Sequence, residues 1–403
     1  MLDVLKIRIY PNPQQELALV KNLGSARFVY NYYLNQTNNQ YLETGKGMTY
    51  CQMAKDLTQL KKHSDYEWLA EATAATLQQS LKNLEVAFNN FFEKRANFPK
   101  FKSKRRKQSI RYPESCSIRN NKLKLPKIGF VKAKIYRDIK IKGKIKSVTV
   151  SQTTTGKYFA SLLFETDDLT VNKEPKISGI DLGLSSLVTV FDGENSDKVD
   201  PIKPIRKYAK RLKRRQQKLS RRVKGSKNCK KAIKEVAKVH EKITNTRADF
   251  LHKLSRKLVD ENQIIVAEDL CLKGLARTKL AKSIHDAGFG MLLNFLSYKL
   301  EREGGKLIRV DRFYPSTKLC SCCNFKNDLL TLSIRDWVCP ECQTHHDRDE
   351  NAAKNLRQEG LRILSTNTEG HSEFEACGET VRLVNTCIKK RVSVNQESPV
   401  ILR

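Results

Sequence analysis

The chain has 403 residues, and its 76 Lys or Arg against 43 Asp or Glu give a formal net charge of +33. The length predicts two or three domains. The charge favours a polyanion as partner, and nucleic acid is the first candidate. The alternative is a basic protein without catalytic activity, such as a ribosome-associated one. The lack of a long uncharged apolar run excludes a transmembrane helix, and the opening residues enter a strand pattern directly, so we expect no signal peptide.

The first part of the chain predicts a strand, a helical region and then several short strands. Residues 5–10 alternate like a strand, and Asn12 and Pro13 form the cap and first turn of a helix. Helices continue to about residue 95 and carry an apolar face that we assign to the core: Leu77, Leu81, Leu84, Phe88 and Phe91. Later strand patterns indicate a small basic antiparallel barrel, which the first strand could join: residues 122–125, 130–135, 144–150 and 158–165.

Two basic segments predict contacts with nucleic acid. Residues 97–107 interleave Phe98 and Phe101 with bases, which offers rings for stacking and cations for phosphates: Lys100, Lys102, Lys104 and Arg105. A solvated linker is the alternative. Residues 203–247 predict a helical pair broken near Gly225, with nineteen Lys or Arg against two Glu. Internal ion pairs cannot neutralise that excess, so we predict phosphate contacts by several of its bases: Lys213, Arg214, Arg215, Arg221 and Arg222.

From residue 177 the pattern becomes strands separated by helices. We predict strands at 177–181, 187–191, 264–267 and 306–312, and helices at 248–260, around 290–303 and from about 349. Strand, hairpin, helix, strand, helix, strand, helix is the element order of an RNase H-like core. The segment after Ser365 has no periodicity, and we expect it to be disordered.

Three acidic residues sit where an RNase H-like nuclease needs them. Asp181 ends the first of these strands, Glu268 ends its neighbour, and Asp349 falls in the first turn of the last helix if Asp347 caps it. Converging carboxylates repel one another unless cations neutralise them, which predicts two Mg²⁺ (or Mn²⁺) ions that activate a water and stabilise the leaving oxygen of a phosphodiester. Each acid could instead have a purely structural role. Glu268 and Asp269 are adjacent, and the sequence leaves open which of the two is a surface charge.

The spacing of four cysteines predicts a structural zinc site. Cys320, Cys323, Cys339 and Cys342 form two Cys-x2-Cys pairs fifteen residues apart, the spacing of a zinc ribbon. We prefer Cys323 to Cys322 because the two gaps are then identical, and His345 and His346 are spare ligands. Of the eleven cysteines four have zinc spacing and the rest are scattered, which fits a reducing cytoplasm. The ribbon precedes Asp349, so its folding could position that acid.

Several motifs together resemble TnpB, also called OrfB, the RuvC-like nuclease of bacterial and archaeal insertion sequences. They include Phe98-Pro-Lys-Phe-Lys, Gly179-Ile-Asp-Leu-Gly, Val266-Ala-Glu-Asp-Leu, Ser316 through Cys323, and Asp347-Arg-Asp-Glu-Asn-Ala-Ala-Lys-Asn. The resemblance covers nearly the whole chain. Two positions depart from it, because the glycine that usually follows the second cysteine of each knuckle is here Asn324 and Gln343, of which Gln tolerates a positive φ less well.

The resemblance implies a multidomain α+β and α/β fold. A wedge-like β-barrel takes residues 1–10 and 96–170, and a helical recognition insertion takes 11–95. A RuvC nuclease domain takes 171–318 and 344–365, a zinc ribbon is inserted at 319–343, and a disordered tail takes 366–403.

The resemblance also implies an RNA-guided DNA endonuclease that cuts beside a short flanking motif. Asp181, Glu268 and Asp349 are then the catalytic acids. The partners are a guide RNA from the element, double-stranded target DNA and a companion transposase, in a prokaryotic cytoplasm near the nucleoid. The competing hypotheses are a non-catalytic regulator of transposition and a strand-transferring transposase, which the zinc ribbon before the last acid argues against.

Overall fold

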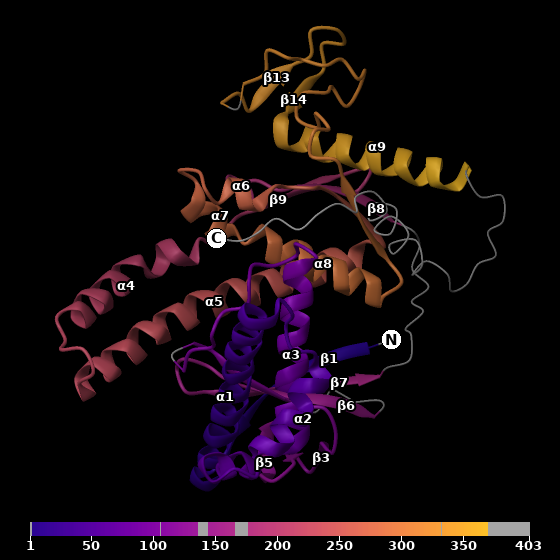
Figure 1. Ribbon diagram of the computed structural model, residues 1–403. Helices are drawn as coiled ribbons and strands as arrows, with labels where there is room; N and C mark the ends of the chain where they lie inside the picture. Colours follow the sequence, from indigo (N-terminus) through magenta and orange to yellow (C-terminus); the bar gives the residue numbers. More distant parts are fainter. Residues whose placement is uncertain (1, 105, 136–143, 166–175, 332, 370–403) are drawn as a thin grey trace. The chain divides into compact units, whose positions relative to one another are not determined.

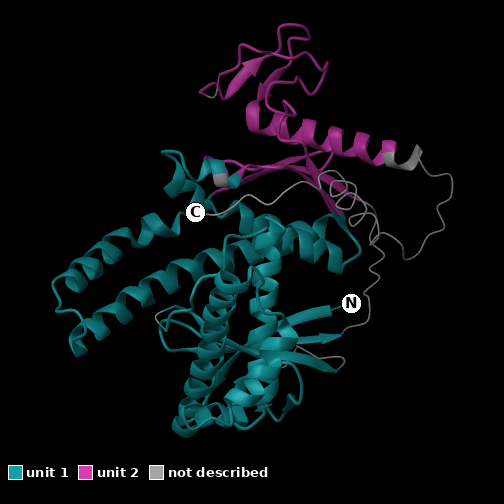
Figure 2. Ribbon diagram, in the orientation of Figure 1, with its two compact units in different colours: residues 1–175, 201–263, 272–306 teal, residues 176–200, 264–271, 307–403 magenta. Residues whose placement is uncertain are grey.

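The computed structural model describes residues 2–104, 106–135, 144–165, 176–331 and 333–369 (Figure 1). The chain divides into two compact units, each built from separate stretches of sequence (Figure 2). Unit 1 comprises residues 1–175, 201–263 and 272–306; unit 2 comprises residues 176–200, 264–271 and 307–403. Among the described residues, every helix is too short or too polar to cross a membrane.

Unit 1 contains a seven-stranded antiparallel sheet. Its order is β2 (Gln108–Tyr112), β6 (Ile145–Gln152), β7 (Tyr158–Glu165), β1 (Leu2–Tyr10), β5 (Gly129–Lys134), β4 (Lys122–Leu125) and β3 (Ser117–Arg119). Ile110 of the first strand and Ile118 of the last contact the same core as Val150 and Ile9, so the sheet curls around one interior. The strand at the N-terminus does join this sheet, between β7 and β5.

The helices α1 (Pro13–Thr44), α2 (Tyr50–Leu60) and α3 (Ala74–Phe92), with the 3₁₀ helix η1 (Ser64–Glu71), form a second core in unit 1. Asn12 caps α1, as predicted, and the structure adds a reciprocal capping box with Gln15. The apolar face of α3 is also confirmed, since Leu77, Leu81 and Leu84 are fully buried and Phe88 packs beside them.

Unit 1 also holds α4 (Pro204–Ser220), α5 (Lys227–Glu261), α6 (Leu272–Leu275), α7 (Ala281–Ala287) and α8 (Phe289–Arg302). The predicted separate helix at 248–260 is wrong, because α5 runs unbroken from residue 227 and contains no Gly or Pro that would end it. Gly225, at φ 85°, makes the turn between α4 and α5. Buried Asp286 of α7 accepts from the backbone N–H groups of Ile205 and Arg206 and so supplies the N-terminal cap of α4.

Unit 2 contains a five-stranded sheet in the order β10 (Ser196–Val199), β9 (Val188–Phe191), β8 (Ile177–Asp181), β11 (Ile264–Glu268) and β12 (Lys306–Val310). β8 is antiparallel to β9 and parallel to β11. A small hairpin of β13 (Asp336–Val338) and β14 (His345–Asp347) leads directly into α9 (Arg348–Glu369), which packs on β8. α9 includes residues 366–369 of the predicted tail; residues 370–403 lie outside the described residues.

Gly179 lets α9 approach β8 closely. A Cβ atom at this position would lie 2.1 Å from the carbonyl oxygen of Ala353 and 2.7 Å from the backbone nitrogen of Arg357. Because both neighbours are backbone, they cannot rotate away. We expect Gly179→Ala to destabilise the protein by about 1–3 kcal/mol or more, measured by urea unfolding. Gly24→Ala is the comparison, at a glycine of α1 whose Cβ would lie 4.0 Å from the nearest side-chain atom, on Arg27, and an equal loss for the two variants would contradict the packing argument.

Candidate active site

The ends of β8 and β11 place two of the predicted acids side by side. The parallel register pairs Ile180 with Ala267, so the next residues, Asp181 and Glu268, leave the sheet at the same edge. Asp349 lies in the first turn of α9, the helix that covers β8. The structure therefore brings all three predicted acids to one edge of the unit 2 sheet.

Electrostatics show that the three carboxylates act on one another. The pKa of Asp181 is raised to about 7, first by burial and then by the negative charges of Asp349 and Glu268, against a lowering effect of Arg348. Burial also raises the pKa of Glu268, with the charge of Asp269 as the second cause. Such mutual repulsion at the end of a sheet is a feature of sites that gather cations.

The structure distinguishes Glu268 from its neighbour Asp269. The carboxylate of Asp269 is ion-paired with Arg312 at 3.1 Å and with Arg309 at 3.6 Å. Glu268 instead contributes to the negative field at Asp181. Of the two adjacent acids, Asp269 is thus paired with bases, whereas the charge of Glu268 acts on Asp181.

Asp349 is held by its helix and contacted by arginines. The Asp347 carboxylate accepts from the backbone N–H groups of Asp349 and Glu350, at 3.0 and 3.1 Å, and so caps α9 as predicted. Both carboxylate oxygens of Asp349 accept from Arg335, at 3.0 Å, and one lies 3.5 Å from Arg348. A cation that joins the acids therefore competes with Arg335 for the same oxygens.

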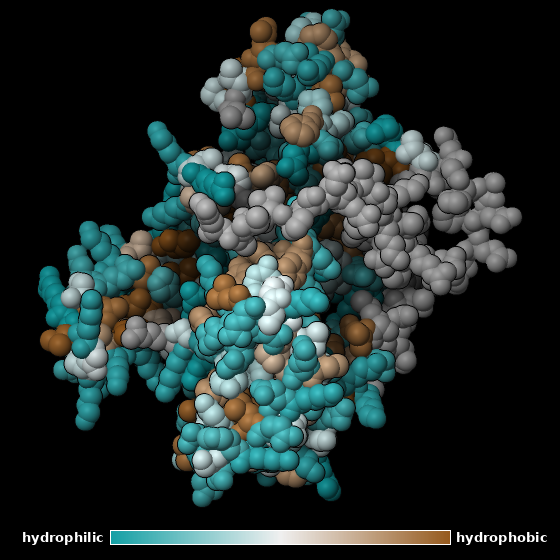
Figure 3. Space-filling model, viewed as in Figure 1, coloured by the Kyte–Doolittle hydropathy of each residue, from teal (hydrophilic) through white to brown (hydrophobic). Residues whose placement is uncertain are grey.

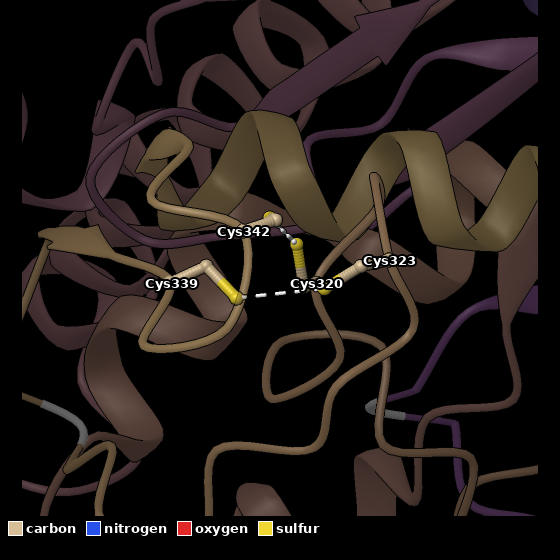
Figure 4. Close-up of side chains that lie close together, drawn as sticks. All are labelled: Cys320, Cys323, Cys339 and Cys342. Atoms are coloured by element: carbon tan, nitrogen blue, oxygen red, sulfur yellow. Dashed lines mark hydrogen bonds between the residues drawn. The ribbon is translucent and has the colours of Figure 1, made fainter.

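The four predicted cysteines form a tight sulfur cluster (Figure 4). The sulfurs of Cys320, Cys323, Cys339 and Cys342 all lie within 4.8 Å of one another, and within the described residues no other set of three or more His, Cys, Asp or Glu is so compact. The acids are thus a looser group. Cys322 is exposed and stands outside the cluster, which agrees with the preference for Cys323.

Both cysteine knuckles have the same turn. The backbone N–H of Asn324 donates to the carbonyl of Cys320 at 2.9 Å, and that of Gln343 to the carbonyl of Cys339 at 3.0 Å. Both residues have positive φ, 62° and 57°, the backbone conformation that favours glycine. The hydroxyl and backbone N–H of Thr344 lower the pKa of Cys342 to about 6, which favours the thiolate that binds metal.

Two buried asparagines tie the first knuckle to α9. The Asn351 side chain donates to the carbonyl of Leu319 at 2.6 Å and accepts from the backbone N–H of Ser321 at 2.9 Å. Asn355 donates to the carbonyls of Ser316 and Leu319, both at 2.7 Å. Each asparagine is 1% exposed. The cysteine module is therefore hydrogen-bonded to the helix that carries Asp349.

A polar cavity of about 390 Å³ lies in unit 1 between α1, α3 and the segment before β2. Lys100, Phe101 and Lys102 line it, and the ammonium of Lys102 stands 3.6 Å from the centre of the Tyr30 ring. Phe98 instead packs edge-on against Phe91 of α3, which gives it a structural role. Lys104 is exposed, and Arg105 lies outside the described residues.

Four of the five predicted bases of the α4–α5 hairpin are exposed. Figure 3 shows hydrophilic side chains standing out along this hairpin. Lys213, Arg214, Arg221 and Arg222 are exposed, whereas Arg215 is half-buried and lies 3.7 Å from Glu235.

Sequence reasoning missed the partners of the acids. Arg335 contacts Asp349, and Lys198 of β10 pairs with Asp347 and Glu350 at 2.8 and 3.0 Å. Glu350 is therefore paired with a base. The position of Arg335, four residues before the last cysteine pair, gave no signal, because only the β13–β14 hairpin turns it toward α9.

Three family models match the chain. One described as a probable transposase matches residues 161–279, one described as a Cas12f1-like TNB domain matches 289–356, and one described as a helix-turn-helix domain matches 1–46. Residues 1–46, which the helix-turn-helix model matches, contain one strand, β1, followed by one long helix, α1.

Similar proteins match along almost the whole chain. A *Streptomyces pristinaespiralis* protein named as a candidate RNA-guided DNA endonuclease is 37% identical over 97% of this chain and 95% of its own length. A similarly named *Escherichia coli* K12 protein is 32% identical over 94% of this chain and 95% of its own length. The solved structure of a Cas12f1 complex with guide RNA and target DNA shares the fold, with a TM-score of 0.58, 14% identity, and 89% and 98% coverage. The chain belongs to the TnpB (OrfB) family.

Proposed function

We propose that the protein is an RNA-guided endonuclease of an insertion sequence, which cuts DNA beside a short flanking motif. The main support is that Asp181, Glu268 and Asp349 lie at one edge of the unit 2 sheet, where Asp181 has a pKa of about 7. Relatives with the same span carry the name of such an enzyme. A purely regulatory nucleic-acid binder has no need of three mutually repelling carboxylates in one place.

The chain's own residues fit a RuvC-like, divalent-metal-dependent hydrolysis. Three carboxylates supply the oxygen ligands that Mg²⁺ or Mn²⁺ prefers, and two such ions, when bound, activate a water and stabilise the leaving oxygen. Glu268 and Asp181 are fixed by the strand ends, Asp349 by the cap at Asp347. Arg335 and Arg348, beside Asp349, can pair with a nearby phosphate when cations take over the carboxylate.

The cysteine cluster fits a structural zinc ion. Four thiolates close a tetrahedral shell and leave no position for substrate, so the ion's contribution is folding energy. Its ribbon supplies the backbone groups that Asn351 and Asn355 bind. Zinc would therefore act on cleavage through the placement of α9.

The basic surfaces of unit 1 fit the nucleic acids. We assign the flanking motif and the guide–target duplex to the curled sheet with its helices, which include the cavity beside Lys100 and Lys102. The partners are a guide RNA and double-stranded DNA, in the cytoplasm. Sequencing of RNA that co-purifies with the protein, followed by cleavage of plasmids that match it and carry randomised flanking sequences, tests the proposal. Absence of a discrete RNA, or a plasmid library that stays wholly uncut with Mg²⁺ present, would overturn it.

The α4–α5 hairpin should bind phosphates. Replacing Lys213, Arg214 and Arg215 together by Gln should reduce the slope of log K against log salt by roughly two to three, since each lost phosphate contact removes about 0.7–0.9. The measurement is nucleic-acid affinity at several salt concentrations. A slope equal to that of the wild type would show that these bases only face solvent.

A further inference from the structure

A small cavity lies on the α4–α5 hairpin, within unit 1. Its volume is about 180 Å³, room for several waters at about 30 Å³ each and so for a phosphate group. Both helices and the turn between them line it, with Arg215, Lys218, Arg222, Asn228, Lys231, Ala232 and Glu235.

The charge inside this cavity is unbalanced. Arg215 and Lys218 are three residues apart on α4, and Arg222 follows in the turn after the helix. Arg215 is half-buried, whereas Lys218 and Arg222 line the cavity from its exposed side. The one lining acid, Glu235, lies 3.7 Å from Arg215 and is also bound to Lys238 at 2.7 Å. Four cations and one acid thus line the cavity, and that acid already has another partner.

Two further observations point to an anion. The Nε atom of Arg215 is buried, and no acceptor for it exists among the described residues. A buried guanidinium N–H without an acceptor is costly, and a bound oxyanion would relieve that cost. In addition, Asn228 and Lys231 belong to the first turns of α5, the 35-residue helix capped by Ser226, and helix N-termini favour negative charge.

We propose that this cavity is a phosphate site, in which the Arg215 guanidinium and the Lys231 ammonium hold one phosphodiester group of a bound nucleic acid. The planar guanidinium donates two parallel hydrogen bonds to phosphate oxygens, which a lysine cannot do. The site differs from the exposed bases of the hairpin because its geometry, as well as its charge, determines the affinity. This inference rests on the proposed function only in requiring that the protein bind nucleic acid.

The first test keeps the charge and changes the geometry. Arg215→Lys should weaken binding roughly tenfold, because the paired charged hydrogen bonds are lost, while the salt slope stays unchanged. Arg362→Lys, at an exposed arginine paired with Glu359 in unit 2, is the matched control and should bind as the wild type does. Affinities are measured separately for the co-purified RNA and for DNA. The nucleic acid that the variant binds less tightly is the one that supplies the phosphate. Wild-type affinity of Arg215→Lys for both would overturn the site.

The second test asks whether both helices hold the same phosphate. Arg215→Lys and Lys231→Gln are combined in a double-mutant cycle. If both side chains hold one phosphate, the fold-loss of affinity in the double variant should be clearly smaller than the product of the fold-losses in the two single variants. Losses that multiply would show separate phosphates and overturn the proposal. If Arg215→Lys lowers the melting temperature, the same cycle with Lys218→Gln and Lys231→Gln, one from each helix, decides instead. Because every readout is an affinity, a wild-type protein that binds but does not cut would refute the proposed function and leave this test intact.

Discussion

The Asp181→Ala protein should bind its nucleic acids and fail to cut DNA. Loss of metal-assisted charge stabilisation is worth several kcal/mol, so we expect cleavage to fall on the order of a thousandfold or more. Binding should survive because removing one carboxylate changes little in a chain of net charge +33. Asp249→Ala is the matched control, since that exposed acid only pairs with Lys253 one helical turn away. Cleavage at the wild-type rate by Asp181→Ala would refute the assignment.

Replacing the same acid by its neutral amide should stabilise the fold although it removes a cleavage residue. The pKa of Asp181 is raised to about 7 in the folded protein, so the folded state binds its proton more tightly than the unfolded chain. Without Mg²⁺, ionised Asp181 therefore destabilises the fold fully above pH 7, and the cost shrinks as pH falls toward 4. Asp181→Asn should raise the melting temperature at pH 8 and raise it less at pH 5. A lowered melting temperature at pH 8 would contradict the repulsion between the acids.

Zinc removal should also abolish most cleavage, although zinc has no part in the chemistry. Cys339→Ser should lose the metal and unfold the ribbon, and the hydrogen bonds from Asn351 and Asn355 to the first knuckle should be lost with it. Cys322→Ser should keep one zinc ion, because Cys322 stands outside the sulfur cluster. Zinc content by elemental analysis and the cleavage rate are measured together.

The variant Asn355→Ala separates the loss of zinc from the loss of contact between the ribbon and α9. This variant leaves all four sulfurs in place but removes two hydrogen bonds, each at 2.7 Å, between α9 and the ribbon. It should retain zinc and cut more slowly. A Cys339→Ser protein without zinc that cuts at the native rate would show that the ribbon does not position Asp349. Loss of zinc from Cys322→Ser with retention in Cys323→Ser would show that the ligand choice is wrong.

Long periodic elements and spaced motifs were predictable from sequence. The strand ending in Asp181 is a short apolar run, and α3 repeats its apolar residues at helical spacing. The short strands β3 and β10 were missed, because three or four mostly polar residues carry no period and form only where a neighbour pairs with them. The start of α5 at residue 227 was predicted by the break at Gly225, but its continuation through residue 248 was not.

The acids themselves were visible in the sequence, but their surroundings were not. Asp181 and Glu268 are placed by the ends of strands, and Asp349 is placed by a capped helix. Local sequence patterns predict strand ends and helix caps alike. Arg335 reaches Asp349 only because the backbone N–H of Arg348 bonds to the Arg335 carbonyl at 2.7 Å, at the open end of the β13–β14 hairpin. Such contacts depend on side-chain direction in three dimensions, which spacing does not encode.

The close packing of Gly179 against Ala353 has a consequence for biosynthesis. The strand that ends in Asp181 is made early, but the helix that covers it and carries Asp349 is made late. A nascent chain that stops before α9 holds two of the acids, an uncovered strand and no third carboxylate. Because contacts so distant in sequence form after the intervening chain has been synthesised, the three acids can come together only on chains translated through α9.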